Sequence, residues 1–265
     1  MLKLLKYEIK ESSKYFIYTI IGNIIASIIL SIVIGTLEDF GDSPLSAIML
    51  LAAFAVFVAA YVGFIFMMIT SYRKDLYTDS AYLKFSLPLT GWNFLNAKTL
   101  LLIFWSFIMA TVTIVVNAIV YSAMFPGFIG TFFKEFLGLN ISIPSITVSL
   151  LLTIISFIEG IILLYFCITF VKSYFKKSKK GYIWFIVYIV FGIIWNIVEV
   201  IIAQVAPYYL SIGTELSIEK MDYFGFLEIT SVSLSYNIVS IVLYLIICVG
   251  LYIFTAYMLD KKVDI

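Results

Sequence analysis

The sequence predicts an all-α integral membrane protein with six transmembrane helices. Three observations support this fold class: an apolar composition, six long apolar runs and a one-sided distribution of basic residues. Hydrophobic residues make up 63% of the 265 residues, charged residues make up 12%, and the mean hydropathy is +1.10. A soluble globular domain is about 45–50% apolar and about 25% charged. We therefore expect lipid to be the solvent for residues 1–265, which we treat as a single transmembrane domain.

Six apolar runs are long enough to cross a bilayer. A hydrocarbon core about 30 Å thick requires about 20 apolar residues in a helix. The runs are continuous and do not alternate as the strands of a membrane barrel would. The first run is too long for the core of a signal peptide, so we expect it to be retained. The predicted spans are residues 15–37, 44–71, 98–124, 147–171, 182–204 and 233–259.

The basic residues lie almost entirely on one side of this arrangement. Fifteen of the 17 lysines and arginines fall in the N-terminal stretch, the second loop with its junction to the third span, the fourth loop and the C-terminal tail. The exceptions are Lys134 and Lys220. Because cytoplasmic segments carry an excess of lysine and arginine, we predict a multi-pass plasma-membrane protein with both termini in the cytoplasm.

The N-terminal stretch, residues 1–14, has the pattern of a basic amphipathic helix. One face carries Leu2, Leu5 and Ile9, and another carries Lys3, Lys6, Lys10 and Lys14. Such a helix would lie on the cytoplasmic interface before the chain turns into the membrane. The alternative is an ordinary positively charged flank of the first span.

The second loop, residues 72–97, combines charge with more apolar surface than a connector needs. It contains Tyr77, Tyr82, Leu83, Phe85, Leu87, Trp92 and Phe94. Apolar and aromatic surface at the cytoplasmic boundary indicates a protein partner. The alternative interpretation is a belt of aromatic residues at the membrane interface.

A short motif in this loop carries a resemblance to a known family. Tyr82 and Leu83 precede the turn Leu87-Pro88-Leu89-Thr90, and Lys98 follows at the mouth of the third span. In this order the chain resembles the membrane subunit of ATP-binding-cassette exporters of the type-two permease family. Asp79-Ser80 stands where that family has Gly-Thr.

The resemblance implies both an architecture and a set of partners. It implies an N-terminal elbow helix, six spans, a coupling helix between the second and third spans and a re-entrant region before the last span. It also implies a second permease, identical or related, and two cytoplasmic ATPases that carry the ATP and Mg²⁺. Membrane lipid is the other expected partner, and no nucleic acid is expected. The residues expected to couple to the ATPase are Tyr82, Leu83, Phe85, Leu87 and Pro88.

The function implied by the resemblance is ATP-driven export of amphipathic or lipophilic cargo, such as hydrophobic peptides, peptide antibiotics or lipid-like molecules. The chain has no G-x-x-x-x-G-K-[ST] phosphate loop and no histidine, so we do not expect it to be an enzyme by itself. A single D-x-x-x-D pair, Asp75 and Asp79, is read as a solvated charged flank. Two alternatives stay open: an ion-coupled secondary transporter or channel, and a membrane enzyme on isoprenoid or phospholipid substrates that would bind metal through these aspartates.

Glu159 and Glu199 are the only charged residues deep in the predicted spans. A charge at mid-membrane costs about 2.5–3.5 kcal/mol or more unless it is paired, protonated or wet. These carboxylates therefore indicate a wall of a translocation path or a contact to a cationic substrate. The alternative is a protonated carboxyl that hydrogen-bonds between helices. Asn117 and Asn237 are expected to form hydrogen bonds between helices.

Overall fold

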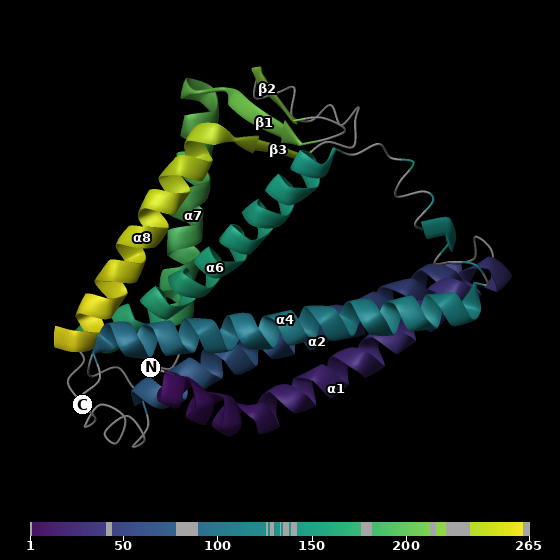
Figure 1. The fold of residues 1–265 in the computed structure, drawn as a ribbon, viewed down its shortest axis with the longest axis horizontal. Helices are drawn as coiled ribbons and strands as arrows, with labels where there is room; N and C mark the ends of the chain where they lie inside the picture. The colour runs from purple at the N-terminus through teal and green to yellow at the C-terminus, as the bar shows by residue number, and fades with distance from the viewer. Residues whose placement is uncertain are drawn as a thin grey trace. The chain divides into compact units, whose positions relative to one another are not determined.

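Figure 1 shows the ribbon of a computed structural model, which describes residues 2–40, 44–77, 90–125, 127, 130–132, 134, 138, 142–175, 182–212, 216–220 and 234–261. Each of its six long helices is long and apolar enough to cross a membrane, which confirms the six predicted spans at that level. The helices are α1 (Leu2–Phe40), α2 (Pro44–Tyr77), α4 (Gly91–Met124), α6 (Ile143–Tyr174), α7 (Ile183–Val205) and α8 (Ile238–Lys261).

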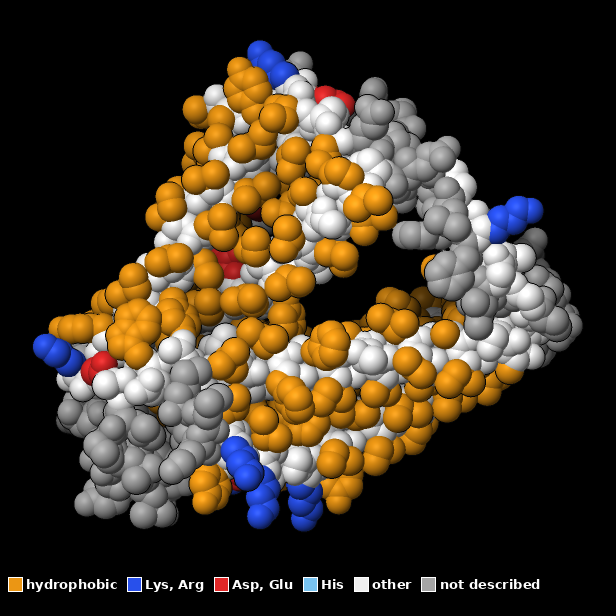
Figure 2. All heavy atoms as spheres, in the orientation of Figure 1, with side chains coloured by type: hydrophobic (Ala, Val, Ile, Leu, Met, Phe, Trp, Pro, Cys, Tyr) orange, Lys and Arg blue, Asp and Glu red, His pale blue; other side chains and the backbone are white. Residues whose placement is uncertain are grey.

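Most helices extend beyond the predicted spans, and two differences change the predicted architecture. The N-terminal stretch and the first span form one uninterrupted helix, α1, instead of an interfacial helix followed by a separate span. Helix α8 begins at Ile238 rather than at residue 233, because residues 234–237 form a strand. Long apolar helices cover the face seen in Figure 2 with hydrophobic side chains, as a lipid-facing surface requires.

The chain divides into two compact units, and each is described by itself. Unit 1 comprises Met1–Leu89 and Asn93–Glu135, and so contains α1, α2 and most of α4. Unit 2 comprises Thr90–Trp92 and Phe136–Ile265, and so contains the first two residues of α4, the helices α6, α7 and α8, and a small sheet.

Aromatic packing and polar side chains hold the three helices of unit 1 together. Phe16 of α1 stacks on Trp105 of α4 with ring centroids 5.1 Å apart, and it meets the edge of Phe64 of α2 at 5.5 Å. Further along the same helices, Ser31 Oγ donates to Asn117 Oδ1 over 3.0 Å. Asn117 is thus an interhelical hydrogen-bond partner, as predicted, in the manner typical of membrane helices.

Three charged side chains, one from each helix of unit 1, meet in its interior. Lys98 Nζ of α4 lies 2.5 Å from Glu8 Oε2 of α1 and forms a second ion pair with Asp75 of α2. All three side chains are at most 4% exposed. The interpretation of Asp75 as a solvated flank is therefore wrong: the side chain is buried. Lys98 lies two turns inside α4 and not at the mouth of that helix.

Unit 2 is packed most tightly around Phe166, Cys167 and Met258, where α6 meets α7 and α8. Helix α6 begins after Ser142, whose Oγ accepts a hydrogen bond from the backbone of Ser145 over 3.2 Å. Cys167 is buried among apolar side chains, as expected from its position in an apolar run. This packed region lies toward the C-terminal ends of α6 and α8.

A three-stranded antiparallel sheet forms the opposite end of unit 2. Its strands are β1 (Tyr208–Ile212), β2 (Leu216–Lys220) and β3 (Leu234–Asn237), in the order β2-β1-β3. Leu210 of β1 is paired with Ile218 of β2 and with Tyr236 of β3. The sheet adds a β element to a chain predicted as all-α. Strands β1 and β2 lie in the segment before the last span, residues 205–232, where the resemblance implies a re-entrant region.

Candidate functional site

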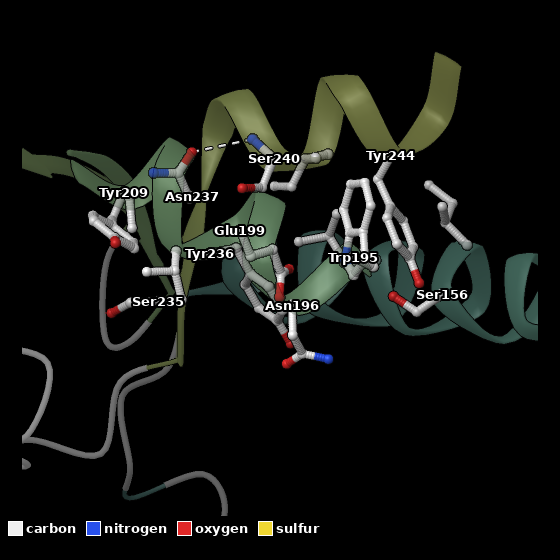
Figure 3. Close-up of a pocket in the computed structure, with 15 residues that line it drawn as sticks. Ser156, Trp195, Asn196, Glu199, Tyr209, Ser235, Tyr236, Asn237, Ser240 and Tyr244 are labelled. Atoms are coloured by element: carbon white, nitrogen blue, oxygen red, sulfur yellow. Dashed lines mark hydrogen bonds between the residues drawn. The ribbon is translucent and has the colours of Figure 1, made fainter. Parts of the chain in front are cut away.

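A pocket of about 720 Å³ lies within unit 2, between its three helices and two of its strands. Pockets of about 300–1,000 Å³ are the usual size for drug-sized ligands. Figure 3 shows the pocket with polar and aromatic side chains that project from α7, β3 and α8. The fifteen lining residues are Leu152, Ile155, Ser156, Trp195, Asn196, Glu199, Val200, Ala203, Tyr209, Ser235, Tyr236, Asn237, Ser240, Ile241 and Tyr244.

Helical periodicity explains why these residues converge. On α7, Trp195, Glu199 and Ala203 recur every four residues and so share one face of the helix. The contributions of α6 and α8 follow the same spacing over single turns. The strands then close one end, because β3 runs directly into α8 and β1 begins shortly after α7 ends.

Aromatic rings form much of the pocket wall. The rings of Trp195 and Tyr244 lie with centroids 4.7 Å apart and an interplanar angle of 53°. Tyr236 lines the pocket from β3, and Tyr209, 7% exposed, lines it from β1. The tyrosines were not predicted as site residues. Tyr209 and Tyr236 come from strands that the sequence did not reveal, and Tyr244 is one tyrosine among 19.

Asn237 holds the end of the pocket in place. Its Oδ1 accepts a hydrogen bond from the backbone N–H of Ser240 over 3.1 Å, which caps the start of α8. Its Nδ2 donates to the carbonyl of Ala206, the residue after α7, over 2.7 Å. Asn237 therefore ties the end of β3 to the residue after α7 and to the first turn of α8. It lies in a strand, so the expectation of a hydrogen bond between two helices is not met at this position.

Glu199 is the one charged residue among the described residues that line the pocket. Asn196, one turn before it, donates from Nδ2 to the carbonyl of Gly192 over 2.8 Å. In the part of the chain that the structure describes, Glu199 has no ion-pair partner. Glu199 thus lines a pocket, and its role as a wall of a translocation path or a contact to a cationic substrate stays a prediction.

Glu159 lies beside the pocket without lining it. It follows Ile155 by four residues on α6, so it lies one turn further along the same face. The side chain is 4% exposed, and its Oε2 has no hydrogen-bond partner among the described residues. Tyr244 lies within electrostatic range of both Glu159 and Glu199. The two predicted carboxylates thus flank one tyrosine in unit 2.

The residues predicted to couple to an ATPase, Tyr82, Leu83, Phe85, Leu87 and Pro88, lie outside the described residues, as does Asp79. Two other aromatic residues counted in the second loop belong to α4 instead. Phe94 is 3% exposed and packs against Tyr72 of α2, with ring centroids 6.0 Å apart. Phe94 therefore belongs to the interior of unit 1, and its assignment to the loop surface is wrong.

The described residues hold no group of three histidine, cysteine, aspartate or glutamate side chains that could bind a metal ion. The candidate site is therefore defined by its shape, its aromatic wall and its carboxylate.

Comparison of the chain with protein-family models, with curated proteins and with solved structures finds no match.

Proposed function

We propose that this protein is the permease subunit of an ATP-driven exporter in the plasma membrane. The observation that carries the proposal is the pocket of about 720 Å³, which combines an apolar lining with one carboxylate inside a protein of six membrane-spanning helices. Such a lining suits an amphipathic cargo, because it offers dispersion contacts, polar side chains and, among the described residues, one charged anchor. The resemblance of the second loop to type-two permeases supports ATP hydrolysis as the energy source.

In this proposal the ATPase is a separate cytoplasmic subunit, because the sequence has no phosphate loop. ATP binding draws two ATPases together, and the second loop passes the movement to the helices of two permeases. The predicted topology places the pocket toward the outer side of the membrane, since Glu199 lies near the C-terminal end of the fifth span. Cargo bound there would be close to release. Hydrophobic peptides, peptide antibiotics and lipid-like molecules are the expected cargo.

The test removes the apolar anchors of the second loop. Changing Tyr82→Ala together with Leu87→Ala should lower the amount of ATPase that co-purifies by at least about tenfold, because a few buried side chains carry most of an interface's energy. The second readout is cargo-stimulated ATP hydrolysis in liposomes. A matched control is Tyr174→Ala with Phe175→Ala, which truncates two aromatic residues, each 49% exposed, beside the other predicted cytoplasmic loop. Unchanged association and unchanged coupling would reject the exporter assignment.

One observation favours a second candidate, an ion-coupled secondary transporter. Glu159 is a buried carboxyl within a predicted span, and intramembrane carboxyls of this kind occur in proton relays. The two candidates differ in their energy source. A secondary transporter would move cargo in liposomes that contain this chain alone, driven by an imposed proton or sodium gradient. An exporter permease would require the ATPase and ATP.

A further inference from the structure

We infer that the pocket of unit 2 binds amphipathic organic cations, with Glu199 as the counter-charge and the aromatic wall as the second recognition element. The inference rests on the proposed function only in calling this molecule the exported cargo. Binding itself is a property of the pocket and does not require an ATPase.

The charges around the pocket favour a cation. Glu199 contributes a negative charge to the lining, and no lysine or arginine is among the described residues that line it. Glu159, one turn deeper on α6, has an oxygen without a hydrogen-bond partner in the described part of the chain. A carboxylate at this depth is costly unless a positive charge or water compensates it. A bound ammonium or phosphonium group would supply that compensation, whereas an anion would add repulsion.

The aromatic side chains favour a diffuse organic cation over a small inorganic one. Trp195, Tyr236 and Tyr244 all line the same pocket as Glu199, and the first and last of these rings are 4.7 Å apart. A cation held over such ring faces is attracted by their quadrupoles, and recognition of quaternary ammonium groups commonly uses this arrangement. The described residues include no group of three histidine, cysteine, aspartate or glutamate side chains that could hold a metal ion, and Glu199 is the one carboxylate among the described lining residues.

The apolar part of the lining determines the rest of the ligand. Leu152 and Ile155 of α6, Val200 of α7 and Ile241 of α8 line the pocket with alkyl groups. A volume of about 720 Å³ accommodates several rings or a branched alkyl chain in addition to the charged group. The ligand class is therefore a singly charged cation on a bulky hydrophobic body.

The experiment compares two probes that have the same shape and opposite charge, tetraphenylphosphonium and tetraphenylborate. Each is equilibrated by dialysis against the purified full chain in a nonionic detergent, with the same detergent on both sides so that partition into micelles cancels. We expect tetraphenylphosphonium to bind at least about tenfold more tightly, because the interaction with Glu199 is attractive for one probe and repulsive for the other. Equal binding of both probes, tighter binding of the borate, or no binding of either would overturn the inference.

Two variants locate the effect. Glu199→Gln keeps the side-chain shape and should weaken tetraphenylphosphonium binding by about tenfold, with less effect on tetraphenylborate. The control, Glu219→Gln, removes an exposed carboxylate of β2 that does not line the pocket, and it should leave both affinities unchanged. Equal losses in both variants would show only an effect of net charge and would overturn the site.

Because the two probes are compared on the unaltered chain, the inference can be rejected even if a variant does not fold. Failure here would leave association with an ATPase untouched, so the two proposals can fail separately.

Discussion

At the scale of single residues, the described part of unit 1 contains ion pairs in two very different surroundings. Lys98 contacts Glu8 and Asp75 in the interior, with all three side chains at most 4% exposed. Lys74 contacts Glu11 over 3.1 Å at the surface, where the side chains are 45% and 46% exposed. Water screens the pair at the surface but not the pairs in the interior. An ion pair should therefore contribute differently to the free energy of unfolding at the two positions.

The first prediction compares these two lysines. Lys98→Met should lower the free energy of unfolding of the protein by about 3–5 kcal/mol, because it leaves two carboxylates buried without their cation. Lys74→Met, the matched control, should lower it by about 1 kcal/mol or less. Thermal unfolding in detergent measures both. Similar losses for the two variants would show that the ion cluster of unit 1 is open to water.

Glu159 presents the opposite case, a buried carboxyl whose Oε2 has no hydrogen-bond partner among the described residues. Burial of an unsatisfied polar atom costs free energy, so Glu159 lowers the stability of the fold. A side chain that lowers stability and lies one turn from a pocket is a natural candidate for a functional role.

The second prediction follows from that cost. Glu159→Leu should raise the free energy of unfolding by about 1–3 kcal/mol, because an apolar side chain of similar size replaces an unsatisfied acid. Glu199→Leu, in the open pocket, should change it by about 0.5 kcal/mol or less. Both variants should lose transport of cationic cargo. A loss of stability in Glu159→Leu would instead indicate that the carboxyl is hydrogen-bonded in the folded protein.

At the scale of elements, the start of α4 packs closely on the end of α8 within unit 2. The backbone N–H of Gly91 donates to Asp260 Oδ1 over 2.5 Å. A Cβ atom at Gly91 would lie 2.7 Å from the carbonyl oxygen of Ala256 and 2.9 Å from Cβ of Leu259. These are atoms of a helix and cannot easily move away, so the contact requires glycine.

The third prediction tests that contact. Gly91→Ala should lower the free energy of unfolding by about 1–3 kcal/mol, because the added methyl group overpacks a helix contact. The control is Gly250→Ala in α8, where a Cβ would meet nothing within 4 Å. This change should be neutral or stabilise the helix by up to about 1 kcal/mol. The measurement is again thermal unfolding, and equal effects of the two variants would contradict the close approach.

The elements also explain why the sequence placed the end of the fifth loop incorrectly. Residues 234–237, Leu-Ser-Tyr-Asn, directly precede the apolar run that begins at Ile238, and the predicted span included them. In the structure they pair with β1 instead, and Asn237 caps the helix that follows. A strand of four or five residues is too short for its alternation to be recognised beside a span of more than 20 apolar residues.

At the scale of the whole molecule, the apolar surface indicates helices that can span a membrane, and the charge distribution predicts their orientation. Helix α7 carries a stripe of Ile193, Ile197 and Ile201 that are 54–56% exposed, as expected for contact with lipid or with a second membrane subunit. The orientation of the helices relative to the cytoplasm depends on the lysine and arginine count alone.

The fourth prediction tests that orientation. In a background without Cys167 and Cys248, single cysteines at Glu219 and at Lys177 should react differently with an impermeant thiol reagent. The position on β2 should be labelled in intact cells, and the position in the fourth loop should be labelled only after the membrane is permeabilised. The reverse pattern would invert the topology and would place the pocket near the cytoplasmic side.

What the sequence by itself determined is the class of protein and the number of helices that can span a membrane. The hydropathy of a segment is a sum of contributions from its single residues. It can therefore be calculated without knowing which residues contact one another. It also identified Glu159 and Glu199 as unusual, because the cost of a charge in lipid depends on depth along one helix. Asn117 was predicted to form a hydrogen bond between helices, and it does so with Ser31. Asn237 was predicted to do the same, but it lies in β3.

Only the tertiary structure decided which of these side chains share a site. The pocket exists because faces of α6, α7 and α8 converge beneath two short strands, and contacts between segments distant in sequence leave no periodic signal in any one of them. Asp75 was misread for this reason: its pattern resembles a solvated flank, and only Lys98, 23 positions away in the numbering, shows that it is buried. Hydropathy shows whether a residue prefers lipid or water. Which side chains surround that residue in the folded protein is determined by tertiary packing.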